Sequence, residues 1–182
     1  FLVDTTSVGY LKKVDEKRLA AAAALVARAV EAASLSKFAN RALPALAVDT
    51  PIGAVVIGGP GSDTYAAGHL AERGAFVLEL GGDDTYEVPI GVGRREVPVG
   101  VFVDLGGKDR YGYEISADSQ DKATRPPSDS AGRYGLAGAT GQTLSRVGRQ
   151  GSGVLGVGLL WDLGGQDDEY ASLTLSQGAG AM

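Results

Sequence analysis

The sequence predicts a mainly β protein: a parallel β-solenoid (β-helix) with coils of about 21 to 29 residues and an N-terminal α-helical cap. Three observations predict this fold class: a repeated Gly-Asp corner, alternating apolar residues before each corner, and an alanine-rich segment before the first repeat. The expected division is a helical cap over residues 1–48 and repeats over residues 49–182, with a polar insertion near 116–135.

The N-terminal segment differs in kind from the rest of the chain. Residues 11–43 include five consecutive alanines at 20–24, which favour a helix. Asp15 suits its first turn, Lys37 suits its last turn, and Pro44 prevents its continuation. We expect this helix to cover the open end of the repeats, where strand edges would otherwise be bare. A membrane-surface or partner helix is the alternative.

An internal repeat is the strongest signal in the sequence. Residues 99–107 read VGVFVDLGG and residues 157–165 read VGLLWDLGG, with six identities in nine positions. Four corner glycines are each followed by Asp and Tyr: Gly61, Gly82, Gly107 and Gly165. Their spacings are 21, 25 and 58 residues, so we expect a further degenerate or decorated repeat within the last interval.

Apolar residues alternate before each corner, which is typical of strands with one buried face. We expect Leu78, Val103 and Trp161 to point inward as a ladder between stacked repeats. The opposite parity, which contains Glu79 and Asp104, is then expected to point outward.

Carboxylates recur at two positions of the repeat and are the candidate metal ligands. Asp63, Asp84 and Asp109 occupy the corner, while Glu79 and Asp104 form a second register before it. Adjacent strands lie ~4.8 Å apart and calcium lies ~2.4 Å from each oxygen ligand, so an ion fits between neighbouring carboxylates. Oxygen ligands without cysteine favour calcium as the cofactor. The alternative is an Asx-turn, in which each Asp accepts a hydrogen bond from the backbone two residues on and needs no metal.

Residues 58–66, GGPGSDTYA, resemble the haemolysin-type (RTX) calcium-binding nonapeptide. In that family, successive turns of secreted β-rolls share calcium between carboxylates and carbonyl groups. The resemblance implies that Asp63 is a calcium ligand.

Composition limits the function classes. With 17 basic and 22 acidic residues the net charge is -5, so a nucleic-acid partner is not expected. No apolar run approaches the ~18 residues that a spanning helix needs, so membrane insertion is not expected either. No cysteine is present, which excludes disulfides, thiolate zinc sites and cysteine nucleophiles.

The function expected from these features is a non-catalytic structural or binding scaffold, stabilised by calcium, within a larger extracellular or cell-envelope protein or assembly. The alternative is a β-helix carbohydrate-active enzyme, a polysaccharide hydrolase or lyase, with Asp104, Asp109 and Arg110 as its best candidates. The last residues, QGAGAM from Gln177, begin a new repeat, as QGSG does at Gln150. A C-terminal continuation, a second chain or an oligomer partner is therefore expected to cover that end, with a glycan as a further partner.

Overall fold

A computed structural model describes residues 9, 12–112, 148–172 and 176–181. The expected insertion near 116–135 lies outside these residues. The described elements are helix α2 (Glu16–Ala32), the 3-10 helices η1 (Leu35–Phe38) and η2 (Leu70–Arg73), and the strands β1 (Leu46–Thr50), β2 (Gly53–Ile57), β3 (Thr64–Tyr65), β4 (Gly74–Glu79), β5 (Thr85–Tyr86), β6 (Val99–Asp104), β7 (Arg110–Gly112), β8 (Gly153–Val154), β9 (Val157–Asp162), β10 (Glu169–Ala171) and β11 (Gly180–Ala181).

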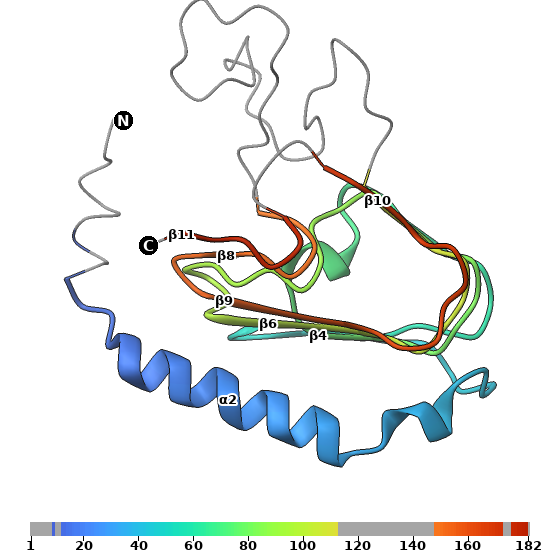
Figure 1. The fold of residues 1–182 in the computed structure, drawn as a ribbon, viewed down its shortest axis with the longest axis horizontal. Coiled ribbons are helices and arrows are strands. Elements are labelled where there is room, and N and C mark those ends of the chain that lie inside the picture. The colour runs from blue at the N-terminus through green and yellow to red at the C-terminus, as the bar shows by residue number, and fades with distance from the viewer. Residues whose placement is uncertain (1–8, 10–11, 113–147, 173–175, 182) are drawn as a thin grey trace, which may run out of the picture.

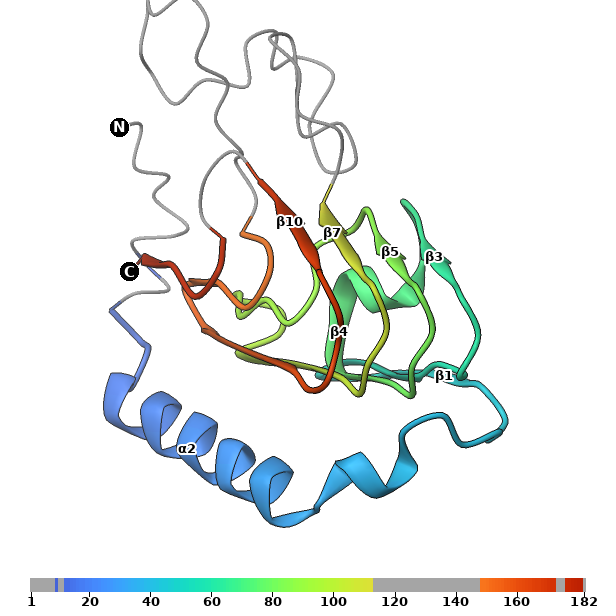
Figure 2. The same cartoon turned by 45° about the vertical axis from the view of Figure 1, so that its right-hand side comes forward.

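The strands form three sheets. A five-stranded sheet has the order β1-β2-β4-β6-β9, a four-stranded parallel sheet has the order β10-β7-β5-β3, and β11 pairs with β8. The first two sheets converge at the Gly-Asp corners, and α2 runs along the outer side of the larger sheet (Figures 1 and 2).

The predicted fold class, a mainly β parallel β-solenoid, is wrong. The chain is a mixed α/β protein in which β1 runs antiparallel to β2 within the larger sheet. The helix also packs against a sheet face rather than over an end of the repeats. Both differences come from the segment before the first repeat, which carries no repeat register to predict them. The division at residues 48 and 49 stays a prediction, and β1 spans that boundary.

Equivalent residues of the repeats pair side by side. We define the repeats as β2 with β3, β4 with β5, β6 with β7, and β9 with β10, and call them repeats 1 to 4. Val103 pairs with Leu78 on one side and with Trp161 on the other, in parallel register. In the smaller sheet Tyr111 pairs with Tyr86 and Tyr170. Residues at the same position of successive repeats therefore form a row that crosses a sheet.

The central strands β4 and β6 of the larger sheet are buried on both faces, and the expected direction of their side chains is reversed. Val77 and Phe102 face the smaller sheet and pack with Tyr86 in the interior. Leu78 and Val103 instead pack in a cluster with the helix. Alternation in the sequence separates the side chains of a strand into two faces, but it does not say which face packs on the smaller sheet and which on the helix.

Helix α2 is shorter than the predicted 11–43. Asp15 is the N-cap, and its side chain accepts a hydrogen bond from the Arg18 amide at 3.1 Å. After Ala32 the backbone of Ser34 turns left-handed, at φ 50°, and Lys37 lies beyond the helix in η1. No helix of the described residues has both the length and the apolar character needed to span a membrane.

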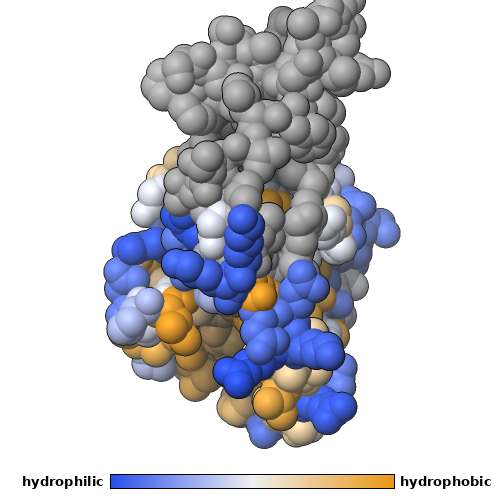
Figure 3. All heavy atoms as spheres, turned by 90° about the vertical axis from the view of Figure 1, so that its left-hand side faces the viewer, coloured by the Kyte–Doolittle hydropathy of each residue, from blue (hydrophilic) through white to orange (hydrophobic). Residues whose placement is uncertain are grey.

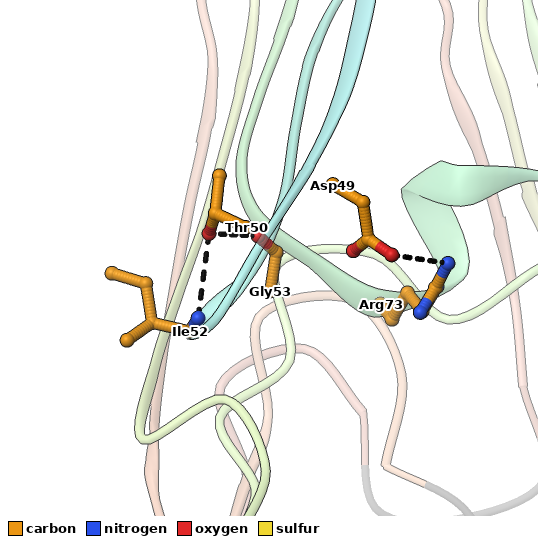
Figure 4. A network of polar contacts seen from close by, with 5 residues as sticks. All are labelled: Asp49, Thr50, Ile52, Gly53 and Arg73. Atoms are coloured by element: carbon orange, nitrogen blue, oxygen red, sulfur yellow. Dashed lines mark hydrogen bonds and ion pairs between the residues drawn. The ribbon is translucent and has the colours of Figure 1, made fainter.

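The hairpin of β1 and β2 closes the first edge of the larger sheet. At its turn the Thr50 hydroxyl donates to the Gly53 carbonyl and accepts a hydrogen bond from the Ile52 amide at 3.3 Å (Figure 4). An ion pair of 2.8 Å between Arg73 and Asp49 connects η2 to β1. This edge therefore has a cover that does not belong to the repeats.

Glycine is required where two corners lie against each other. Gly107 has φ +152°, and a Cβ there would lie 1.8 Å from the Gly82 carbonyl oxygen. Gly61, the equivalent residue of repeat 1, has open space around its Cβ position. Close approach of corner backbones and a positive φ therefore explain the glycine at Gly82 and Gly107, but not at Gly61.

We predict that Gly107→Ala destabilises the protein by about 2 kcal/mol or more, because the backbone is strained and a carbonyl must move. Gly61→Ala should change the free energy of unfolding by less than about 0.5 kcal/mol. Urea unfolding of the two variants measures the difference. Equal effects would contradict the close packing of the corners.

A second pair of variants tests the packing of α2. Val30 is buried against the sheet, whereas Leu25 on the same helix is 66% exposed. Val30→Asp should cost about 3 kcal/mol because it buries an unpaired charge, and Leu25→Asp about 1 kcal/mol or less. A helix that does not pack on the sheet would give two similar unfolding curves.

Candidate metal centre

A row of carboxylates lies in the interior, at the ends of the strands of the larger sheet. Glu79 pairs with Asp104, and Asp104 pairs with Asp162. Glu79 and Asp104 are both 0% exposed, contrary to the outward direction predicted for them. The strand ends where it meets the corner, so this row lies close to the corner aspartates.

The corner aspartates form a second row, linked from repeat to repeat. The Asp63 amide donates to Asp84 Oδ1 at 2.6 Å, and the Asp84 amide donates to Asp109 Oδ1 at 2.8 Å. The Asp109 amide donates in the same way to Asp168 Oδ1 at 2.9 Å. Each of these carboxylates therefore accepts from the corner of the preceding repeat, not from the backbone two residues on.

An Asx-type contact does occur, but in the strand register. Asp104 Oδ1 accepts a hydrogen bond from the Gly106 amide at 2.9 Å. The expected alternative to metal binding is thus present at Asp104, whereas the corner aspartates use their carboxylates between repeats.

Four tyrosines stack beside the two carboxylate rows. Ring centroids are 5.0 Å apart from Tyr65 to Tyr86, 4.9 Å from Tyr86 to Tyr111, and 4.4 Å from Tyr111 to Tyr170. The stacking makes these tyrosines a ladder within the protein. It leaves the flat faces of the inner rings to each other rather than to a sugar.

The tyrosine hydroxyl groups donate to the strand carboxylates. Tyr86 Oη donates to Asp104 Oδ2 at 2.6 Å, and Tyr65 Oη donates to Glu79. Tyr111 Oη lies 3.3 Å from the same oxygen of Asp104. The sequence shows tyrosines and carboxylates at fixed offsets, but these pairs were not predicted because the strand carboxylates were expected outside.

Asp84, Asp104 and Asp109 form a cluster that could hold a metal ion. Each offers one oxygen, these three oxygens lie within 4.8 Å of one another, and all three residues are buried. Two of the predicted ligands lie elsewhere. Glu79 is further along the strand row, and Asp63 is exposed at the first corner.

Burial disfavours the ionised forms of these carboxyls. Loss of hydration raises the pKa of Asp84 to about 6. The hydrogen bond from the Asp63 amide opposes this shift, and the negative charge of Asp104 adds to it. The same causes raise the pKa of Asp109 to about 7. Loss of hydration raises the pKa of Glu79 to about 8 against the hydrogen bond from Tyr65, and it also raises the pKa of Asp104.

Within the described part of the chain, the cluster has hydrogen-bond acceptors but no positively charged partner. None of the ion pairs among the described residues includes Asp84, Asp104 or Asp109. Asp109 is 2% exposed, and its Oδ2 atom has no hydrogen-bond partner among the residues that the structure describes. Either protons or a cation must therefore balance the negative charge in this part of the interior.

The burial of these groups also limits catalysis. Asp104 and Asp109 are buried, and Arg110 is directed toward Glu169, at 3.7 Å between Nε and Oε2. A polysaccharide outside the protein cannot reach either carboxylate without unpacking the sheets. This geometry does not bring the three expected catalytic residues together at a surface.

The outer surface offers less specific chemistry. On the side at the left of Figure 1, apolar patches are separated by hydrophilic side chains (Figure 3). The pairs Arg73–Asp49 and Arg95–Glu96 join partly or largely exposed groups, which contribute little to stability.

Sequence reasoning missed the interior role of Gln150, although it used the repeated Gln-Gly as a marker. Gln150 Nε2 donates to the Tyr111 carbonyl at 2.7 Å and approaches the Ala171 carbonyl at 3.3 Å. Gln150 is buried at 3% exposure, so its side chain joins repeats 3 and 4.

The fold and site together define a protein with a buried carboxylate cluster that could hold a metal ion. No protein-family model, curated protein or solved structure matches the chain. The functional argument therefore rests on the geometry of the site.

The raised pKa values predict an unusual dependence of stability on pH. The folded protein binds protons more tightly than the unfolded chain at Glu79 and Asp109, whose ordinary pKa values are 4.5 and 3.8. Stability should therefore fall as pH rises from about 5 to about 8, by about 2 kcal/mol or more in the presence of a chelator. Urea unfolding at several pH values measures this fall.

Glu79→Gln provides the control because the amide cannot titrate in this range. Its free energy of unfolding should fall less steeply with pH than that of the parent protein, whatever its stability at pH 5. A parent protein that becomes more stable between pH 5 and pH 8 would contradict the raised pKa values.

Proposed function

We propose that the protein is a non-catalytic structural or binding scaffold whose interior is stabilised by calcium. It works within a larger extracellular or cell-envelope protein or assembly. Asp84, Asp104 and Asp109 are the proposed ligands.

The observation that carries this proposal is that Asp109, one of three buried carboxylates that lie together, has an Oδ2 atom with no hydrogen-bond partner among the described residues. A buried ionised oxygen without a donor is costly, and a divalent cation supplies the missing interaction. The neighbouring carboxylates of Asp84 and Asp104 offer oxygens at a separation that one ion can bridge.

The chemistry of the ligands is the reason for choosing calcium over magnesium. The cluster offers carboxylate oxygens in a buried position, and these oxygens lie within 4.8 Å of one another. Magnesium demands near-octahedral geometry and gives up its bound waters reluctantly, so a dry group of carboxylates suits calcium better.

A scaffold is favoured over the carbohydrate-active enzyme because the interior is filled. Tyrosine rings stack at 4.4 to 5.0 Å beside the carboxylates, and no substrate-sized space separates them. Asp104 already accepts from Tyr86 and from the Gly106 amide, which are structural contacts.

The resemblance to the haemolysin-type repeat supports the choice of ion but suggests a different ligand. Asp63 is exposed, and its amide donates to Asp84, so it lies next to the proposed ligands rather than among them. Extracellular modules commonly bind calcium at about 0.1 to 1 mM, which suits the proposed location.

Thermal unfolding during a calcium titration tests the proposal. Calcium that binds only the folded chain should raise Tm in a saturable way, with a stabilisation of about 2.7 kcal/mol at one hundred times Kd. Magnesium at the same concentrations should have a smaller effect. Asp109→Asn keeps an acceptor for the Asp84 amide but removes the charge, so it should abolish most of the calcium response.

Asp167→Asn is the matched control, since Asp167 is exposed at a corner and outside the cluster. Its calcium response should equal that of the parent protein. A Tm that is unchanged by millimolar calcium and by chelator would reject the calcium site, and an equal response in both variants would place calcium elsewhere.

A further inference from the structure

The two ends of the rows of repeats are built differently. At the first end, β1 pairs along β2, and the His69 ring packs edge-on against Tyr65 with centroids 4.7 Å apart. Tyr65 is therefore only 4% exposed although it is the first ring of the stack. Residues outside the repeats therefore cover the edge of β2 and the outer face of Tyr65, while β1 and β3 are the last strands of their sheets at this end.

At the opposite end, β9 and β10 are the last strands of their sheets in the described part of the chain (Figure 2). Tyr170 stacks on Tyr111 through one ring face and is 37% exposed. A hollow of about 710 Å³ lies there, lined in part by Leu160, Trp161 and Gln177. The β11 segment lies against β8 beside it, so part of the next layer is already in position.

This end presents the same groups that bind one repeat to the next. Corner amides of Asp63, Asp84 and Asp109 each donate to an aspartate of the following repeat. The equivalent Asp168 amide has no hydrogen-bond partner among the described residues. The open end therefore offers a strand edge, an aromatic face and an unused corner donor in the geometry of an internal interface.

Charge indicates which kind of segment fits. The last corner is acidic, with Asp167 and Glu169 exposed. Within the protein, Arg110 of repeat 3 lies beside Glu169. A second copy placed symmetrically on this end would bring two acidic corners together. At the first end of such a copy, β1 and His69 already occupy the positions next to β2 and Tyr65.

We propose that the open end formed by β9 and β10 binds a partner polypeptide segment built like repeat 3 of this chain. Such a segment has an apolar strand, a Gly-Gly corner with basic residues, and Asp-x-Tyr after the corner. Its first strand extends β9, its tyrosine stacks on Tyr170, and its aspartate accepts from the Asp168 amide. Its basic residues face Glu169.

This inference names a partner for the proposed scaffold and so rests on that function, but its test requires no metal. The probe is a fluorescein-labelled peptide with the sequence of residues 99–112, VGVFVDLGGKDRYG. Fluorescence anisotropy measures its binding to the full chain, in chelator and in calcium. Binding in chelator would support the docking surface even if the calcium proposal failed.

Variants of the chain and of the peptide test the predicted contacts. Tyr170→Ala should weaken peptide binding about five-fold or more, whereas Tyr170→Phe, which keeps the ring, should bind within two-fold of the parent chain. Ile52→Ala, at the opposite end and 67% exposed, is the matched control. In the peptide, Tyr111→Ser and Arg110→Glu should each weaken binding at least three-fold, and these arms hold even if Tyr170→Ala unfolds the chain.

Three results would overturn the proposal. The first is no binding to the folded chain at 1 mM peptide, far above the roughly micromolar affinity expected of a useful peptide contact. The second is equal affinity for the parent peptide and its Tyr111→Ser variant. The third is a dimer in sedimentation experiments that dissociates on Tyr170→Ala, because a second copy would then occupy this end.

Discussion

Carboxyl groups enclosed between two sheets must receive hydrogen bonds or a counter-charge, and the rest of this structure follows from that requirement. The corner aspartates receive theirs from the amide of the preceding repeat, as Asp84 and Asp109 do. The strand carboxylates receive theirs from tyrosine hydroxyl groups, as Asp104 does from Tyr86. Both donors are available only when the repeats lie in one register. The polar interior therefore fixes an alignment that apolar side chains alone would leave less well defined.

The same requirement explains why the corner is the most constant part of the repeat. Glycine allows two corners to approach, as Gly107 and Gly82 do, and the approach brings each aspartate within reach of the next amide. A larger residue would push the two corners apart and would thereby separate each carboxylate from the amide that donates to it. Backbone spacing and polar contacts are thus parts of one arrangement.

Much of the repeat organisation could be predicted from the sequence. The strands before the corners, their side-by-side pairing through residues such as Leu78 and Val103, and the tyrosine row all follow from residues at fixed offsets. The direction of the faces could not be predicted. Helix α2 covers Leu78 and Val103, and no periodic signal in the sequence connects the helix to that face.

The predicted fold class was wrong because the segment before the first repeat could not be predicted from the repeat pattern. Strand β1 and helix α2 precede the first repeat, and each contributes a feature that a purely repetitive pattern does not contain. Of the five predicted ligands, Asp84, Asp104 and Asp109 meet, because the strand end and two successive corners come together there. Glu79 and Asp63 occupy the same positions in earlier repeats, but neither belongs to the group of carboxylates that lies close enough together to hold an ion.

The corner glycines are 21, 25 and 58 residues apart, yet β5, β7 and β10 pair in parallel register on both sides of the longest interval. The register in which these strands pair therefore does not depend on the number of residues between them. Loop-closure entropy grows slowly with length, so a longer connection costs little once its ends are fixed. The register of the repeats is consequently independent of the number of residues between successive corners, since β7 and β10 pair across the longest interval as β5 and β7 pair across a short one.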